Sequence, residues 1–237
     1  MKKITIDEGN TFVKLAFFEN NQMVFRECDV NLERVKELVS KCDRLIISSV
    51  KQNTLFEPLL SSKFVISLNP STPLPITNCY ETPLSLGNDR IALAVGATEN
   101  FPNNNVLVID AGTCITYDFI NSKKEYLGGS ISPGIQMRYN ALHHFTSQLP
   151  LLESVDAAML TGDNTEGSIH SGIINGVLAE IDGIIQRYTN QYPNIKVIVT
   201  GGNAKFFDKG LKNTIFANPN LLMEGLNKIL DYNESHF

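Results

Sequence analysis

The sequence predicts an α/β fold made of two copies of a mixed β-sheet flanked by helices. Short apolar runs near the N-terminus indicate strands, and later segments alternate between helical and strand patterns, which is typical of a mixed sheet covered by helices. The order strand, Asp-x-Gly turn, strand, turn, strand occurs twice, from residue 3 and again from residue 106. This repeat indicates a duplicated domain, and we place the two domains at residues 1–104 and 105–237.

The first half of the chain begins with strands and continues with helices and strands in alternation. Its predicted elements are strands at 3–7, 12–18 and 23–25, a helix over 32–39, a strand at 45–47, a helix near 55–60 and a strand at 64–66. Asn20 and Asn21 favour a tight turn between the second and third strands. Asn31 is placed to cap the first helix. Residues 68–87 contain four prolines and little periodicity, so we expect a long surface loop with a functional role.

The second half repeats the opening pattern and then becomes mainly helical. Its predicted elements are a helix from 88, strands at 106–109, 115–120 and 126–131, helices over 134–146 and 168–188, a strand at 197–200 and a helix over 221–230. The apolar residues of the helix at 168–188 form one broad stripe, so most of that face is expected to pack on the core.

Composition and charge exclude several classes of function. With 20 Lys and Arg against 25 Asp and Glu, the chain has a net charge of −5 and shows no basic cluster, which argues against a dedicated nucleic-acid binder. The four cysteines lack metal-site spacing, so reduced thiols and no structural zinc are expected. No apolar run is long enough to cross a bilayer, and no secretion signal is evident. We therefore expect a cytoplasmic protein without a membrane partner.

Two acidic turns carry the candidate chemistry. In the segment 7–11, a glycine allows close backbone approach to a ligand, Asp7 offers oxygen ligands to a hydrated Mg²⁺, and Lys14 can approach phosphate oxygens. Taken alone, this segment is more simply explained as a hairpin turn. The second turn, at 110–113, favours a site, because two such turns facing each other across a cleft could hold a triphosphate from both sides.

The ordered motifs of the chain resemble those of type III pantothenate kinases. The matching segments are Asp7 to Thr11 with Lys14, Pro83 with 86–90, 110–113, 127–129, Pro133-Gly134, Leu149-Pro150, Gly162 with Thr165, Gly172, 200–202 and 224–226. Each match is weak by itself, whereas the ordered set spans residues 7–226. The resemblance implies the actin-like ATPase fold, in which ribonuclease H-like domains with mixed sheets are duplicated around a central cleft.

The same resemblance implies an activity and a set of site residues. The activity is phosphorylation of pantothenate with ATP to 4′-phosphopantothenate, the first step of coenzyme A biosynthesis, with Asp89 as the proton acceptor. Residues implied in ATP binding are Asp7, Glu8, Gly9, Asn10, Thr11, Phe12, Val13, Lys14 and Thr113. Residues implied in pantothenate binding are Tyr80, Gly87, Asn88, Asp89, Arg90 and Thr165. The resemblance also implies Mg²⁺ with the ATP, K⁺ or NH₄⁺ at Asp110, and a homodimer, for which Gly172 and Gly176 offer minor support.

Some positions depart from the family pattern, and other functions stay open. Glu8 stands where an aliphatic residue is usual, with a small effect if its side chain points outward; Asn88, Cys114 and Asn203 depart as well. An actin-like kinase or phosphatase for another small substrate would share the fold. A non-catalytic regulatory relative is a further alternative, which a helix-turn-helix or a basic arm would favour.

Overall fold

The computed structural model describes residues 1–51, 54, 56–59 and 65–234. These residues form two compact units. The first gathers Met1–Asn103, Ile120–Leu127 and Asn220–Phe237, and the second gathers Asn104–Phe119 and Gly128–Pro219. The C-terminal helix therefore packs within the first unit. The division into domains at residues 104 and 105 stays a prediction.

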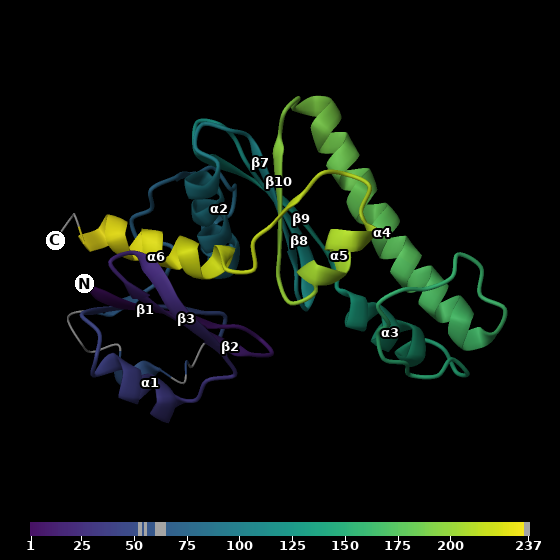
Figure 1. Cartoon of the computed structure of the whole chain (residues 1–237), viewed down its shortest axis with the longest axis horizontal. Coiled ribbons are helices and arrows are strands. Elements are labelled where there is room, and N and C mark those ends of the chain that lie inside the picture. Colours follow the sequence, from purple (N-terminus) through teal and green to yellow (C-terminus); the bar gives the residue numbers. More distant parts are fainter. Residues whose placement is uncertain (52–53, 55, 60–64, 235–237) are drawn as a thin grey trace. The chain divides into compact units, whose positions relative to one another are not determined.

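The first unit is built on a five-stranded mixed sheet in the order β3-β2-β1-β4-β5, of which β1, β2 and β3 are labelled in Figure 1. Its elements are β1 (Lys2–Glu8), β2 (Val13–Glu19), β3 (Gln22–Cys28), α1 (Leu32–Val39), β4 (Arg44–Ser49), β5 (Val65–Ser67), α2 (Asn88–Asn100) and α6 (Leu221–Glu234). Strand β1 pairs antiparallel with β2 and parallel with β4, which pairs parallel with β5. The carboxyl ends of β1, β4 and β5 therefore meet at one edge of the sheet.

The two faces of this sheet have different neighbours, because side chains alternate along a strand. Ile4 and Ile6 belong to the apolar cluster that contains Val35 and Leu38 of α1. On the opposite face, Thr5 donates a hydrogen bond of 3.2 Å to the Met223 sulfur of α6. Helix α6 in turn packs against α2. Asp7 follows Ile6 in β1, so its side chain lies on the same face as Thr5, the face that packs against α6.

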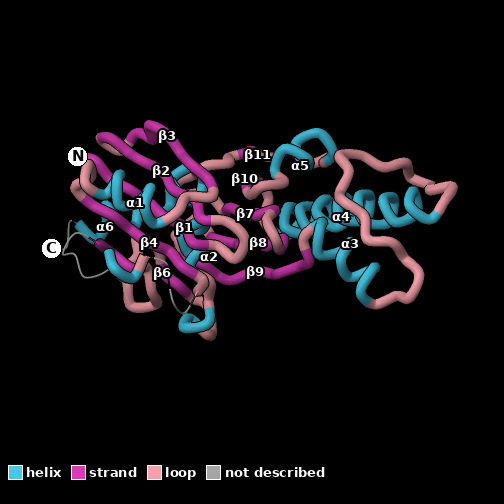
Figure 2. Tube along the Cα trace, turned by 90° about the horizontal axis from the view of Figure 1, so that it is seen from below, coloured by secondary structure: helices cyan, strands magenta, loops and turns pink. Residues whose placement is uncertain are grey.

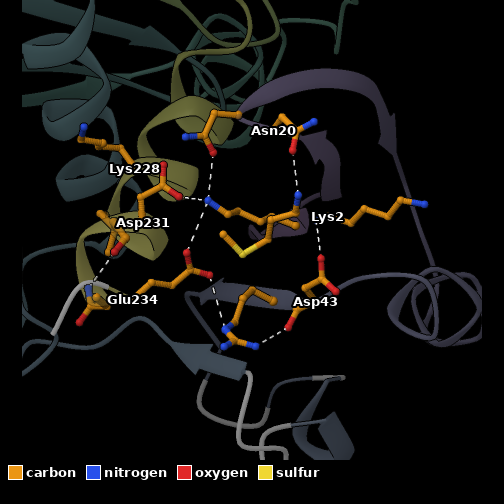
Figure 3. A network of polar contacts seen from close by, with 12 residues as sticks. Lys2, Asn20, Asp43, Lys228, Asp231 and Glu234 are labelled. Carbon is orange, nitrogen blue, oxygen red and sulfur yellow. Dashed lines mark hydrogen bonds and ion pairs between the residues drawn. The ribbon is translucent and has the colours of Figure 1, made fainter. Parts of the chain in front are cut away.

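A buried lysine, Lys3, attaches α6 to the first strand; Figure 3 draws the surrounding polar network, with Asp231 and Glu234 of α6 labelled. The Lys3 side chain is 2% exposed, and its ammonium forms an ion pair with Asp231 and a hydrogen bond of 3.0 Å to Asn21 Oδ1. Glu234 Oε2 lies 3.7 Å from the same ammonium, and Glu234 Oε1 lies 3.5 Å from Arg44 Nε. The C-terminal helix is therefore held to β1 by charge as well as by apolar packing.

The second sheet has the order β11-β10-β7-β8-β9-β6 (Figure 2). The remaining elements are β6 (Thr77–Asn78), β7 (Val106–Ala111), β8 (Cys114–Ile120), β9 (Glu125–Pro133), α3 (Ile135–His144), α4 (Thr165–Gln191), β10 (Lys196–Thr200), α5 (Ala204–Gly210) and β11 (Phe216–Ala217), with 3-10 turns at Glu57–Leu59 and Pro83–Ser85. The order β9-β8-β7-β10-β11 repeats β3-β2-β1-β4-β5. This repeat confirms the predicted pair of mixed sheets.

Local predictions are mostly confirmed. Asn20 and Asn21 adopt positive φ, 49° and 66°, as a tight hairpin turn requires. Asn31 caps α1 by accepting a hydrogen bond of 2.9 Å from Arg34 N. Three elements, β6, α5 and β11, were not predicted. The helix predicted near 55–60 lies partly outside the described residues, and the described part at Glu57–Leu59 is a 3-10 turn. Within the described part of the chain, no helix combines the length and apolarity needed to cross a membrane.

Candidate active site

The first acidic turn lies at the sheet edge where β1 and β4 end. Asp7 is opposite Lys14 of β2 and Ser48 of β4 in the strand register, so the three side chains share one face. The Asp7 side chain is nearly buried, at 4% exposure, and accepts a hydrogen bond of 3.2 Å from Ser48 Oγ. Carboxyl ends of parallel strands are a common place for ligand sites in α/β proteins.

Asp7 also has unusual electrostatics. Burial raises the pKa of Asp7 to about 6; the positive charge of Lys14 lowers it, and the negative charge of Asp89 raises it further. The charge of Asp89 thus acts on Asp7 within the first unit. A buried carboxylate with a second one nearby is a strong candidate for a functional group that meets a cation.

This arrangement predicts that Asp7 lowers the stability of the ligand-free protein. Between about pH 4 and pH 6 the folded state keeps a proton that the unfolded state has released, so stability falls as the pH rises through this window, and the full cost is present above pH 6. Asp7→Asn is therefore expected to stabilise the ligand-free chain by about 1–3 kcal/mol at pH 7.5. Urea unfolding at pH 7.5 and pH 4 measures this, with the exposed Asp156→Asn as control. An equal gain at both pH values would contradict it.

The tip of the turn is accessible to a ligand. Gly9 N donates a hydrogen bond of 3.1 Å to Phe12 O, which closes the hairpin. Asn10, Thr11 and Phe12 are exposed, with 54% of the Phe12 side chain accessible. Their main-chain amides and short polar side chains can therefore approach an anion, as the sequence suggested.

Glu8 does not point outward. Its side chain is 0% exposed and lies on the α1 face of the sheet, opposite to that of Asp7. Ser49 Oγ donates to Glu8 Oε2 at 2.8 Å, and Lys51 Nζ lies 3.6 Å from Glu8 Oε1. The negative charge added beside the turn is thus compensated by Lys51. Because the Glu8 side chain is buried on the α1 face, a contact between Glu8 and ATP would be made by its main chain.

Helix α2 begins beside this edge of the sheet. Gly87 is its N-cap residue, in an extended conformation. The Asn88 amide donates hydrogen bonds to Leu68 O at 2.9 Å and Ser49 O at 3.5 Å, which attaches the helix to the ends of β5 and β4. Asp89 Oδ1 accepts a hydrogen bond of 2.9 Å from Arg90 N. Asn88 therefore holds the first turn of α2, and with it Asp89, near Asp7.

The proline-rich loop meets the same helix. The Arg90 guanidinium lies 5.8 Å from the centroid of the Tyr80 ring, a cation–π geometry, and Arg90 is 6% exposed. Tyr80 is further held by a hydrogen bond of 3.0 Å from its main-chain N to Asn78 Oδ1 and by the neighbouring Tyr126 ring. The structure thus brings the two residues together, and their role in substrate binding stays a prediction.

The second acidic turn lies in the second unit, where β7 and β10 end. Asp110 is opposite Thr200 in the parallel register. The next residue, Gly201, has φ +93°, and a Cβ there would lie 2.3 Å from Asp110 Oδ1, so only glycine fits. Gly112 N donates to Cys114 O at 3.0 Å, and Thr113 is exposed. The Thr-Gly-Gly segment is therefore a structural partner of the Asp110 turn.

Thr165 is the first residue of α4, and it does not cap that helix. The cap is Asn164, whose Oδ1 accepts a hydrogen bond of 2.8 Å from Gly167 N. Thr165 lines a groove of about 400 Å³ between α3 and α4. Its other lining residues are Leu142, Leu149, Ser168, Ile169 and Gly172. A hydroxyl at the edge of an apolar groove fits a ligand contact, which stays a prediction.

Sequence reasoning missed the serines of the first site. Ser48 binds Asp7 and Ser49 binds Glu8. The available signal was the pair of serines that closes the apolar strand at 45–47, because an apolar strand that ends in polar residues places them at the sheet edge. Asp7, Lys14 and Asp89 lie together in the first unit, and Asp110 and Thr113 lie in the second. Convergence of the two turns on one nucleotide stays a prediction.

Comparisons with known proteins identify the family. A family model described as Type III pantothenate kinase matches residues 3–187. The chain is 45% identical to a Type III pantothenate kinase of Christiangramia forsetii, over 98% of this chain and 99% of that protein. It is 47% identical to a Type III pantothenate kinase of Cytophaga hutchinsonii, over 97% and 99%.

The fold agrees as well. The activator of the 2-hydroxyisocaproyl-CoA dehydratase from Clostridium difficile, solved with bound ADPNP, has a TM-score of 0.54 at 12% identity and covers 100% of this chain and 97% of its own. With the repeated strand order, this likeness shows the actin-like ATPase fold. A family match over more than half of the chain, together with near full-length relatives, shows that the chain belongs to the type III pantothenate kinase family.

Proposed function

We propose that this chain transfers the γ-phosphoryl group of ATP to the primary alcohol of pantothenate, giving ADP and 4′-phosphopantothenate, the first step of coenzyme A biosynthesis. The observation that carries the proposal is the buried Asp7, on which the charge of Asp89 acts, at the ends of parallel strands in a chain of this family. Phosphoryl transfer requires positioning and charge stabilisation more than covalent chemistry, and the residues at this edge of the sheet are proposed to supply both.

Asp89 is the proposed general base. It would accept the hydroxyl proton of pantothenate as the alcohol oxygen attacks the γ-phosphorus in line. Asn88 holds the helix turn that carries Asp89 through its bonds to Leu68 O and Ser49 O. Lys14, on the same face as Asp7, is placed to offset negative charge on the transferred phosphoryl group. The exposed turn 9–12 would bind the phosphates through its main-chain amides.

The acidic residues of the first site fit Mg²⁺. Asp7 is a buried carboxylate whose pKa is raised by burial and by nearby carboxylates, and a hard cation with oxygen ligands would relieve that repulsion. Asp7 would hold the ion, directly or through its water ligands. Bound Mg²⁺ would neutralise phosphate charge.

The second turn is proposed to contact ATP and to hold a monovalent cation. Thr113 is exposed at the turn and can donate its hydroxyl to a phosphate oxygen. Asp110 lies at the end of β7, with main-chain groups of Ala111 and Gly201 close by. A carboxylate and main-chain carbonyls are oxygen ligands of the kind that K⁺ prefers, so K⁺ or NH₄⁺ is the expected ion.

Pantothenate is proposed to bind next to Asp89. The Arg90 guanidinium suits the carboxylate of pantothenate, and Tyr80 holds the guanidinium by its cation–π contact. Gly87 and Asn88 would contribute main-chain contacts at the start of α2. Thr165, at the edge of its groove, is also proposed as a pantothenate contact through its hydroxyl.

A homodimer is the proposed assembly. Phe145, Met159 and Leu160 are 82%, 77% and 83% exposed in the segments around α3 and α4, an apolar surface that favours a protein contact. A Cβ added at Gly172 or Gly176 would meet nothing within 4 Å, which leaves room for close approach by a second helix. A cytoplasmic location and the domain division at 104 and 105 are also proposed, from the sequence.

A coupled assay of ADP release tests the function. With pantothenate and K⁺, steady turnover is expected. If a cation at Asp110 supports ATP binding, replacing K⁺ by Na⁺ should lower the turnover rate about tenfold or more. The control is Asp110→Asn, which should lose the difference between the two ions. ADP release with a sugar or another small acid and none with pantothenate would favour the alternative kinases. Absence of ADP release with any acceptor would favour the non-catalytic relative.

A further inference from the structure

A hydrogen-bonded network joins four elements of the second unit. Tyr117 of β8 donates from its hydroxyl to Glu180 Oε1 at 2.9 Å, and Arg138 Nη2 of α3 donates to Glu180 Oε2 of α4 at 2.6 Å. The same Nη2 donates to Ser132 Oγ of β9 at 2.9 Å. Tyr117 is 1% exposed, while the side chains of Arg138 and Glu180 are 22% and 27% exposed. The ion pair is therefore partly withdrawn from solvent.

The Glu180 carboxylate is ionised and faces the positive guanidinium of Arg138. Burial raises the pKa of Glu180, but hydrogen bonds from Arg138, Ser132 and Tyr117 outweigh burial and lower that pKa below its ordinary value. Glu180 is therefore an anion at neutral pH. A guanidinium paired with a carboxylate by short, charge-assisted hydrogen bonds is a rigid connection between two helices.

Arg138 also controls the chain that leads into its own helix. Its Nε donates a hydrogen bond of 2.9 Å to Pro133 O, one turn back. One guanidinium thus binds three acceptors, on Ser132, Pro133 and Glu180. The planar fork of arginine permits this, whereas the ammonium of lysine cannot reach all three from one place. The segment at 132–134 is thereby fixed relative to α4.

The segment that Arg138 fixes supports the second acidic turn. Gly134, the N-cap of α3, lies so close to that turn that a Cβ on it would be 2.2 Å from Thr113 O and 2.7 Å from Gly112 O. Interiors this tightly packed transmit displacements. A shift of Pro133 and Gly134 would therefore move the peptide between Gly112 and Thr113.

We propose that Arg138 and Glu180 are positioning residues for ATP. Through Pro133 and Gly134 they hold the main chain of the Gly112–Thr113 turn in the shape that receives the nucleotide phosphates. This inference rests on the proposed role of Thr113 as an ATP contact. The hydrogen bonds of Arg138 and Glu180 go to Tyr117, Ser132, Pro133 and each other, and the proposed effect on the nucleotide passes through the turn.

The test is nucleotide affinity in four variants of the full chain: Arg138→Met, Arg138→Lys, Glu180→Gln and the double variant of Arg138→Met with Glu180→Gln. Isothermal titration with a non-hydrolysable ATP analogue and Mg²⁺ gives Kd without any need for pantothenate. Arg138→Met is expected to raise Kd about tenfold, as loss of a supporting contact typically does, with Arg138→Lys raising it less. The double variant should exceed Arg138→Met by less than about threefold, since the two residues act as one unit.

The control is Arg187→Met, an exposed change on the same helix α4, which should leave Kd within about twofold of the parent. KM for pantothenate should also stay within about twofold in Arg138→Lys. If Arg138→Met does not fold, Arg138→Lys and Glu180→Gln decide. Any one of three results overturns the proposal. They are a lowered Tm with unchanged Kd, independent effects of the two residues on Kd, and a parent protein that does not bind the analogue. A parent that binds the analogue without phosphorylating pantothenate refutes the substrate assignment, and Kd still decides the positioning role.

Discussion

Replacing Asp89 by asparagine is expected to lower kcat by about 10²- to 10⁴-fold, the range associated with loss of a positioned general base. Asparagine is nearly the same size and can still accept the hydrogen bond from Arg90 N, so the start of α2 should keep its conformation. What it cannot do is take the proton of the substrate alcohol. Steady-state kinetics with saturating ATP and pantothenate measures the effect, and circular dichroism confirms the fold.

The matched control for Asp89 lies at the other end of the same helix. Glu99 of α2 forms surface ion pairs with Lys228 at 3.0 Å and Lys124 at 4.0 Å, and Glu99→Gln should leave kcat within about twofold, since exposed ion pairs contribute little. A folded Asp89→Asn protein that keeps more than a tenth of the parent kcat would remove the base assignment.

The second large effect concerns stability, and it depends on which member of the buried Lys3–Asp231 ion pair is removed. Asp231→Ala removes the nearer of the two α6 carboxylates that form ion pairs with the Lys3 ammonium, whose side chain is 2% exposed. Loss of one partner of a buried pair typically costs about 3–5 kcal/mol, and we expect about 3 kcal/mol because Asn21 and Glu234 remain near. Lys3→Met removes the buried charge itself and leaves carboxylates that are about one fifth exposed, so roughly 1–2 kcal/mol is expected.

Urea unfolding of the two variants at pH 7.5 provides the measurement. The control is Lys2→Met: its ion pair with Glu19, 3.6 Å apart, is about half exposed on both sides, so a change of about 0.5 kcal/mol or less is expected. If Lys3→Met proves more costly than Asp231→Ala, the buried cation left without Asp231 is not the dominant cost.

Alkaline pH adds a second check. Burial lowers the pKa of Lys3, so the unfolded state binds more protons above that pKa, and the parent gains stability as the pH rises toward the ordinary lysine value. Lys3→Met should lose this gain.

Much of the local structure followed from short-range chemistry. Asparagines at 20, 21 and 31 predicted a turn and a helix cap, and both are present, because these features depend on neighbouring backbone groups alone. Helix α5 and strand β11 escaped prediction: both segments are short, and Asn203 at the N-cap position of α5 makes no side-chain cap hydrogen bond. The side chain of Glu8 shows the same limit. A charged residue at a turn is usually solvated, and only the position of Ser49 and Lys51, more than forty residues away, explains its burial.

The sequence by itself determined the fold class, the family and the two acidic turns, because alternating apolar runs and short turn motifs are local patterns that survive in the order of residues. The tertiary structure decided how those motifs are used. Parallel pairing of β1 with β4 set Ser48 beside Asp7, the first turn of α2 brought Asp89 close enough to influence the Asp7 pKa, and the position of Gly134 behind Thr113 connected Arg138 to the second turn. Such contacts join residues distant in sequence, and their energies depend on burial and on separations of a few ångströms, which no local pattern encodes.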